Sequence, residues 1–184
     1  MMVGLFGGAF DPPHNGHVAL ARGAVEHFRL ERLVVLVVSD PGHRDVHTAA
    51  DSRLRLARAA FPGYEVELDS HARTVDMLRE GRFADPVFLI GADELAEFLS
   101  WKEPDAVLEL ARLGVAARPG CLPEELEPVL ARLRRPERVE LFEIEPVPVS
   151  STGIRERIAR GESIESLVPP AVAHVVEELA LYRS

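Results

Sequence analysis

Short apolar runs and amphipathic segments alternate along the whole chain. Apolar runs are typical of strands buried in a parallel sheet, and five of them lie at residues 3–6, 33–38, 86–90, 113–117 and 139–144, with an alternating segment at 64–68. Apolar residues at helical spacing predict helices over residues 18–28, 51–60, 74–79, 94–99, 104–113, 123–134, 152–160, 163–168 and 170–181. We therefore expect an α/β fold with a Rossmann-like doubly wound parallel sheet and helices on both faces, in a single domain over residues 1–184.

Composition narrows the class of protein. The chain has 184 residues, 47% of them hydrophobic, which is enough to build a packed core and argues against disorder. It carries 21 basic and 30 acidic residues, a formal net charge of −9, so we expect no non-specific binding of nucleic acid. Cys121 is the only cysteine, which excludes a disulfide framework and a cysteine-based zinc site.

The sequence also gives expectations about location. The first residues lack a charged segment followed by an apolar run and a cleavage site, and no apolar run is long enough to span a membrane. We therefore expect a cytoplasmic protein with no membrane partner. The oligomeric state stays open, and a homo-oligomer is compatible with the sequence.

The first candidate site is the segment at residues 7–17, between the first strand and the first helix. Gly7 and Gly8 allow a ligand to approach the backbone, and His14 and His17 lie three residues apart where the helix begins. We expect Asn15 to be the N-cap of this helix. Because helix N-termini favour anions, the combination predicts a phosphate site.

Two simpler interpretations compete with the phosphate site. The glycine pair could be an ordinary turn, and the histidines could bind zinc, for which only Asp11 is close enough in sequence to serve as a third ligand. The position of the segment at the carboxyl end of the first strand favours a ligand site, because open parallel sheets bind ligands at that edge.

The second candidate site is the segment at residues 149–155, Val-Ser-Ser-Thr-Gly-Ile-Arg. Serine and threonine are good N-caps, so a plain helix start explains the hydroxyl groups. It does not explain Arg155, a cation close to the positive end of the helix dipole, or Gly153 within the helix. A bound polyphosphate accounts for both, since hydroxyls, backbone N–H groups and a guanidinium would converge on it.

These two segments resemble the signature motifs of the HxGH nucleotidyltransferases, and most closely those of the bacterial nicotinate-nucleotide adenylyltransferases. The first reads GGxFDPxHxGH and the second (I/V)SSTxIR. Further similar segments are Gly91-Ala92-Asp93 followed by Trp101, Arg118-Pro119-Gly120, and Leu181-Tyr182. The resemblance covers residues 3–182.

The resemblance implies transfer of an adenylyl group from ATP to nicotinate mononucleotide, with Mg²⁺ carried on the ATP phosphates and no metal site of the protein's own. It implies the catalytic residues His14, His17 and Arg155. It implies ATP binding by Gly7, Gly8, Phe10, His14, Gly16, His17, Gly91, Asp93, Arg118, Ser151, Thr152 and Arg155. It implies acceptor binding by Ala9, Arg44, Thr74 and Trp101.

Several of these assignments have simpler alternatives. Asp93 would bind ribose hydroxyls, or it could cap the following helix. Trp101 would stack on the pyridine ring of the acceptor, or it could be a packing anchor between helices. Arg118 would lie near the adenine, or it could belong to a strand-ending turn.

The departures from the family pattern fall on the acceptor side. Ala9 replaces a common serine, only His43-Arg44 remains of a PPHK/R loop, and Ala72-Arg73-Thr74 keeps one hydroxyl of a SYTxxT segment. The alternatives that stay open are therefore a nicotinamide mononucleotide or dual-specificity adenylyltransferase, another HxGH enzyme such as phosphopantetheine adenylyltransferase, and a nucleotide sensor without activity.

Overall fold

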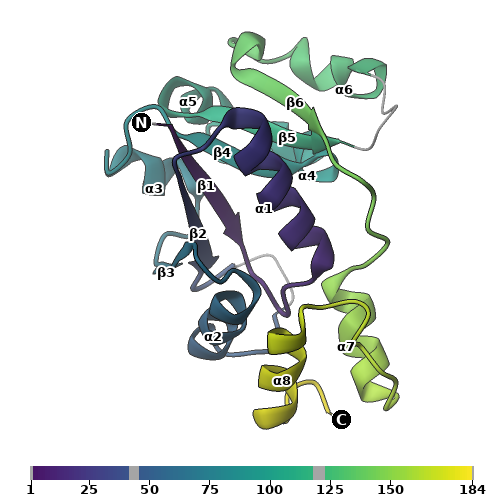
Figure 1. The fold of residues 1–184 in the computed structure, drawn as a ribbon. Coiled ribbons are helices and arrows are strands. Elements are labelled where there is room, and N and C mark those ends of the chain that lie inside the picture. The colour runs from purple at the N-terminus through teal and green to yellow at the C-terminus, as the bar shows by residue number, and fades with distance from the viewer. Residues whose placement is uncertain (1, 42–45, 118–122, 184) are drawn as a thin grey trace.

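Six parallel strands form one sheet in the order β3-β2-β1-β4-β5-β6 (Figure 1). The computed structural model describes residues 2–41, 46–117 and 123–183. The strands are β1 (Val3–Gly8), β2 (Arg32–Val38), β3 (Glu65–Asp69), β4 (Val87–Gly91), β5 (Arg112–Ala117) and β6 (Val139–Glu143). The helices are α1 (Asn15–Phe28), α2 (Ala50–Ala60), α3 (Thr74–Arg79), α4 (Ala92–Glu97), η1 (Phe98–Ser100), α5 (Pro104–Leu110), α6 (Pro123–Leu130), η2 (Pro136–Arg138), α7 (Ser151–Ala159) and α8 (Pro170–Glu178).

The sheet is buried on both faces because successive side chains of each strand point in opposite directions. In β4, Val87 and Leu89 pack on the side of α1, α2 and α8, whereas Phe88 and Ile90 pack on the side of α3, α4 and α5. Each face buries a hydrophobic cluster of its own, which explains why the central strands read as nearly continuous apolar runs. The predicted doubly wound sheet is confirmed.

The order of the strands creates a binding crevice. β1 pairs with β2 on one side and with β4 on the other, so the chain reverses its winding direction at β1. Open α/β sheets bind ligands at such a switch point, outside the carboxyl ends of the strands. Gly7 and Gly8 are the last two residues of β1 and therefore lie at this crevice.

The last part of the chain returns to the same edge. After β6 the backbone runs past α1 without regular structure and enters α7, and α8 then packs beside α2 (Figure 1). This path brings residues 150–182 next to the loop that follows β1.

One predicted helix is absent, and three predicted helices end earlier than expected. Residues 163–168 form a single turn rather than a helix, with Val168 N–H donating to Ile164 O. The segment is too short to nucleate a helix, and the prolines at 169 and 170 disfavour helical backbone before them. The helix predicted to reach residue 113 ends at Leu110, because residues from Arg112 onward form β5. The helices predicted to reach residues 134 and 181 end at Leu130 and Glu178.

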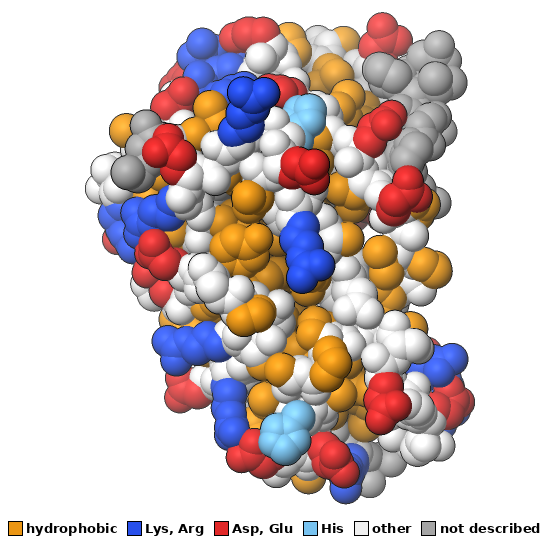
Figure 2. Space-filling view, in the orientation of Figure 1, with side chains coloured by type: hydrophobic (Ala, Val, Ile, Leu, Met, Phe, Trp, Pro, Cys, Tyr) orange, Lys and Arg blue, Asp and Glu red, His pale blue; other side chains and the backbone are white. Residues whose placement is uncertain are grey.

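Charged side chains of both signs are interspersed on the face seen in Figure 2, around apolar side chains near its centre. Among the helices of the described ranges, none is long and apolar enough to cross a membrane.

Candidate active site

The start of α1 is built by two histidines that cap each other. His14 is the N-cap in extended conformation, and its Nδ1 accepts a hydrogen bond from His17 N–H at 3.4 Å. In return His17 Nδ1 accepts from His14 N–H at 3.2 Å. The two rings stack with their centroids 3.7 Å apart. The prediction that Asn15 is the cap is wrong: its side chain instead donates to Ser166 O, and its N–H donates to Leu167 O.

This mutual capping determines which nitrogen of each imidazole carries the proton. Each Nδ1 receives an N–H, so it must carry a lone pair, and the ring proton of the neutral form lies on Nε2. Burial lowers the pKa of His14 to about 4, so this ring is neutral at pH 7. His14 is therefore held at pH 7 with Nε2–H as its hydrogen-bond donor.

Gly16 completes the start of the helix for steric reasons. A Cβ placed there would lie 3.1 Å from the His14 ring, so a side chain would press against the stacked pair. The N–H groups of Asn15 and His17 are used within the protein, whereas among the described residues nothing accepts from Gly16 N–H. Gly16 thus supplies the backbone donor of this helix N-terminus.

The start of α7 is fastened to the loop before α1. Ser150 caps α7 by accepting from Gly153 N–H at 3.1 Å. Ser151 Oγ donates to Pro12 O at 2.8 Å, and Arg155 Nη1 donates to Asp11 O at 2.8 Å. The Ser151 hydroxyl is thus committed to the loop in this structure, where sequence reasoning had assigned it to a phosphate.

Arg155 and Thr152 have hydrogen-bond donors that their described contacts do not use. Arg155 Nη2 donates to Thr152 Oγ1 at 3.3 Å, so Arg155 uses two of its five N–H groups in the bonds described and the Thr152 hydroxyl keeps its proton. The structure therefore brings the second motif to the first, with a partly buried cation beside the loop that leads into His14.

Asp11 connects this loop to two other parts of the chain. The sequence had suggested Asp11 only as a zinc ligand. Its buried carboxylate accepts Tyr182 O–H through Oδ1 at 2.6 Å and His47 N–H through Oδ2 at 2.6 Å. Burial and this hydrogen bond raise the pKa of Tyr182. The end of the chain and the segment before α2 are thus joined to the loop through one carboxylate.

The carboxylate of Asp11 is already used in hydrogen bonds within the described part of the protein. Both Asp11 oxygens already accept hydrogen bonds, and within the ranges the structure describes, no three His, Cys, Asp or Glu side chains cluster as a metal site would require.

Phe10 holds the loop by packing. Its backbone is left-handed, with φ of 51°, and its ring is buried against Phe6, Phe61 and His17. A Cβ on Gly8 would lie 2.9 Å from this ring, so the second glycine of the pair makes room for it. The assignment of Phe10 to ATP binding is therefore restricted to its backbone, because its side chain belongs to the core.

Arg53 is the main residue that sequence reasoning missed. It lies on α2 with 1% of its surface exposed and donates only to backbone carbonyls. The acceptors are Thr48, Ala9, Val38 and Ser39, at 2.7 to 3.0 Å. Burial lowers the pKa of its guanidinium. The only signal in the sequence is its spacing, since Arg53 falls in line with Ala57 and Ala60 on the buried side of α2.

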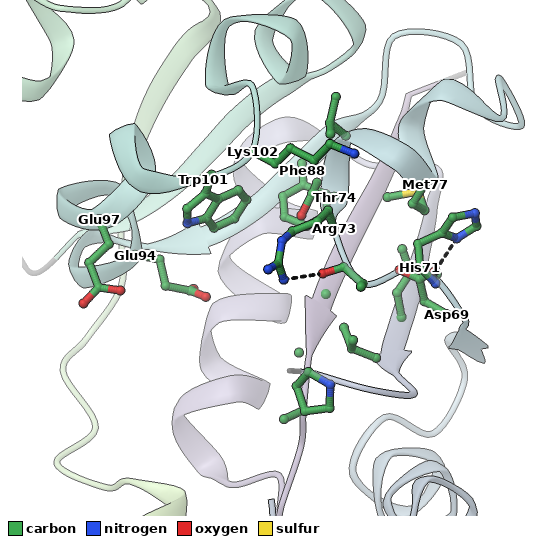
Figure 3. A pocket seen from close by; sticks show the side chains of 18 of the residues that line it. Asp69, His71, Arg73, Thr74, Met77, Phe88, Glu94, Glu97, Trp101 and Lys102 are labelled. Atoms are coloured by element: carbon green, nitrogen blue, oxygen red, sulfur yellow. Dashed lines mark hydrogen bonds and ion pairs between the residues drawn. The ribbon is translucent and has the colours of Figure 1, made fainter. Parts of the chain in front are cut away.

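A cavity of about 320 Å³ opens on the other side of β1, between α3 and α4 (Figure 3). Its floor is the end of β1, where Gly7 lacks a side chain and lets Phe88 approach: a Cβ there would lie 3.1 Å from the Phe88 ring. Three residues assigned to the acceptor, Ala9, Thr74 and Trp101, line this cavity. The structure thus brings these three residues together, and His14, His17 and Arg155 are not among the residues that line the cavity.

Trp101 is a packing anchor, as the simpler interpretation predicted, and its ring also reaches the cavity. It packs edge-on against Phe98 and Phe88, with ring centroids 5.2 and 6.2 Å away, and it also lines the cavity. Asp93 is exposed in the first turn of α4, which is capped by Gly91 while the Glu94 side chain accepts from Gly91 N–H. Asp93 as N-cap is therefore wrong. Arg44 and Arg118 lie outside the described residues.

The buried neutral histidine predicts a pH-dependent stability. The pKa of His14 is about 4 in the folded chain and about 6.5 when unfolded, so between these values the unfolded chain binds more protons. The contribution of His14 to the unfolding free energy is therefore fully present above about pH 6.5, and it is lost as the pH is lowered toward about 4. On going from pH 7.5 to 5, the wild type should lose about 2 kcal/mol more unfolding free energy than His14→Asn, which keeps a capping side chain that does not titrate. Urea unfolding at both pH values measures this, and parallel losses in the two proteins would contradict it.

The fold and site together define a nucleotidyltransferase of the α/β type, with the starts of α1 and α7 brought together at the carboxyl edge of its sheet. The cytidylyltransferase-like family matches residues 5–157 of the sequence. Nicotinate-nucleotide adenylyltransferases of Rubrobacter xylanophilus and Thermus thermophilus are 37% and 38% identical to it, over 100% of this chain and 93% and 100% of theirs. The chain therefore belongs to the nicotinate-nucleotide adenylyltransferase family.

A solved structure supports the fold independently. Nicotinic acid mononucleotide adenylyltransferase from Plasmodium falciparum, in complex with NaAD, superimposes with a TM-score of 0.75 at 16% sequence identity. The match covers 98% of this chain and 96% of the other.

Proposed function

We propose that this protein transfers the adenylyl group of ATP to nicotinate mononucleotide, giving nicotinate adenine dinucleotide and pyrophosphate. The observation that carries the proposal is the stacked pair of His14 and His17, whose Nδ1 atoms accept the capping hydrogen bonds, so that the proton of each neutral ring lies on Nε2. The names of the Rubrobacter and Thermus relatives and the NaAD complex of the Plasmodium structure point to the same reaction.

In the proposed reaction, an oxygen of the acceptor phosphate attacks the α-phosphorus of ATP in line. A bond forms between that oxygen and phosphorus, the bond from the α-phosphorus to the bridging oxygen breaks, and pyrophosphate leaves with the electron pair. A phosphate is already nucleophilic, so the protein needs no general base and forms no covalent intermediate. Catalysis then consists of positioning and charge stabilisation.

The residues at the two helix starts would share this work. His14 and His17 would donate through Nε2 to oxygens of the α- and β-phosphates, and Gly16 N–H would add a backbone donor. Arg155 and Thr152 would hold the β- and γ-phosphates and orient pyrophosphate for departure. Ser151 would act indirectly, by fastening α7 to the loop through Pro12.

The remaining assignments place the two substrates on opposite sides of the loop. The acceptor would occupy the cavity, where Trp101 can stack on its pyridine ring and Thr74 and Ala9 line the wall. Gly7 and Gly8 would let the phosphates approach the end of β1, and Gly91, Asp93 and Arg118 would contact the nucleoside of ATP. Arg44 is assigned to the acceptor phosphate. Mg²⁺ bound to ATP would neutralise part of the phosphate charge.

The test is release of pyrophosphate from ATP and Mg²⁺, with nicotinate mononucleotide and nicotinamide mononucleotide compared side by side. We expect a strong preference for the nicotinate form. Comparable rates would instead indicate a dual-specificity enzyme. Release with neither acceptor would contradict the proposal and favour another acceptor, such as phosphopantetheine, or a sensor.

A further inference from the structure

Three of the charged side chains that line the cavity, Asp69, His71 and Lys102, are paired within the protein. Asp69 Oδ1 accepts from the His71 ring at 2.7 Å, and the other ring nitrogen of His71 lies 3.2 Å from Glu80. Lys102 Nζ contacts both oxygens of Asp76, at 2.8 and 3.0 Å. These ion pairs satisfy the charges within the protein, so none of them requires a ligand.

Arg73 differs from the other basic residues of the cavity, His71 and Lys102, because it has no carboxylate partner among the described residues. Its only hydrogen bond among the described residues is from Nη1 to Ala72 O at 3.0 Å, and no carboxylate of the described residues forms an ion pair with it. Figure 3 shows its guanidinium extending from the turn before α3 into the cavity, on the side of Trp101 that faces away from Glu97. Most of its five N–H groups therefore remain available to a ligand.

The surroundings of this guanidinium suit a flat anionic ring. Trp101 and Phe88 form an aromatic wall of the cavity, and the volume of about 320 Å³ can accept a small ring. Glu97, from α4, lies on the other side of Trp101, has no ion-pair partner among the described residues and makes that side negative. A carboxylate on a ring held against Trp101 would be repelled from that side and attracted to Arg73.

We propose that Arg73 determines the specificity of this cavity by binding the carboxylate of nicotinate mononucleotide as a bidentate pair. A guanidinium matches a carboxylate in geometry and charge, whereas the amide of nicotinamide carries no charge to pair with it. This assignment rests on the proposed function, because it takes the pyridine mononucleotide as the occupant of the cavity. It also gives a role to a residue at which the chain departs from the SYTxxT pattern of its family.

The test is calorimetric titration of nicotinate and nicotinamide mononucleotides into the protein, in the presence of a non-hydrolysable ATP analogue. We expect Arg73→Gln to weaken binding of the nicotinate form by about 10- to 100-fold and of the nicotinamide form by less than about 3-fold. Arg73→Lys should recover part of the loss, because it restores the charge without the fork. Arg79→Gln is the matched control, since Arg79 lies on the same helix but is paired with Glu103. It should change neither affinity.

The outcomes separate this assignment from its alternatives. Equal weakening of both mononucleotides by Arg73→Gln would mean that Arg73 contacts their shared phosphate or only supports the fold, and would overturn the proposal. Unchanged affinities, or no binding of the nicotinate form to the wild type, would overturn it as well. A wild type that binds nicotinate mononucleotide through Arg73 but releases no pyrophosphate would refute the proposed function while supporting the specificity assignment.

Discussion

Replacement of His17 by alanine is expected to lower kcat for pyrophosphate release by at least about 100-fold. The change removes one of the two Nε2 donors proposed to stabilise the charge that develops on the transferred phosphate. It also removes the Nδ1 acceptor of His14 N–H and the ring on which His14 stacks, so the second donor loses its orientation. The cost to stability should be only about 1 kcal/mol, the usual effect of losing a helix cap.

The matched control is His27→Ala. His27 lies in the last turn of the same helix, where it pairs with Glu140 at the surface, far along the helix from the loop. We expect this variant to keep kcat within about twofold of the wild type and to lose a similar small amount of stability. A His17→Ala protein that keeps its circular dichroism spectrum and wild-type turnover would refute the role of the histidine pair.

Replacement of Arg53 by methionine is expected to reduce the unfolding free energy by at least about 3 kcal/mol. Methionine fills similar space, but it leaves the carbonyls of Ala9, Val38, Ser39 and Thr48 without the donors that Arg53 supplies to each of them. Buried carbonyls that lose their partners carry the full cost of desolvation. The loop after β1 should also lose the hydrogen bond that Arg53 donates to Ala9 O, so kcat should fall together with the unfolding free energy.

The matched control is Arg55→Met on the same helix. Arg55 is exposed and pairs with Glu178, so its loss should cost no more than about 1 kcal/mol. Urea unfolding of both variants measures the difference between them. Equal unfolding midpoints for Arg53→Met and the wild type would show that the buried guanidinium does not support the loop.

The sequence predicted the sheet better than the ends of its helices. Apolar runs identify buried strands because both faces of a parallel sheet are covered, and all six predicted strands are present. Helix ends depend on which hydrogen bonds compete for the backbone. The turn at residues 163–168 has local causes in its length and the prolines that follow it, but its contact with Asn15, which donates to the carbonyls of residues 166 and 167, could not be predicted from the sequence.

The candidate site was predicted in its parts but not in its connections. The sequence located the histidine pair and the segment at 150–155, and the structure brings both to one loop. It could not reveal that Ser151 is committed to Pro12, or that Tyr182 donates to Asp11, because each bond joins residues more than a hundred positions apart. The ring of Phe10 looked like part of a ligand motif, and only packing shows that it is core.

By itself, then, the sequence determined what depends on local pattern and chemistry: the alternation of strands and helices, the two motifs and the residue types able to bind phosphate. The tertiary structure alone decided what depends on distant partners. Burial keeps His14 neutral, so that it can act as a hydrogen-bond donor. Arg53 holds the loop after β1 through the carbonyl of Ala9. Among the described residues, Arg73 has no ion-pair partner in the cavity, whereas the neighbouring Lys102 is paired with Asp76. The physical reason is that the solvation and pairing of a charge depend on every group that surrounds it in space. A sequence lists these groups but does not show which of them lie near the charge.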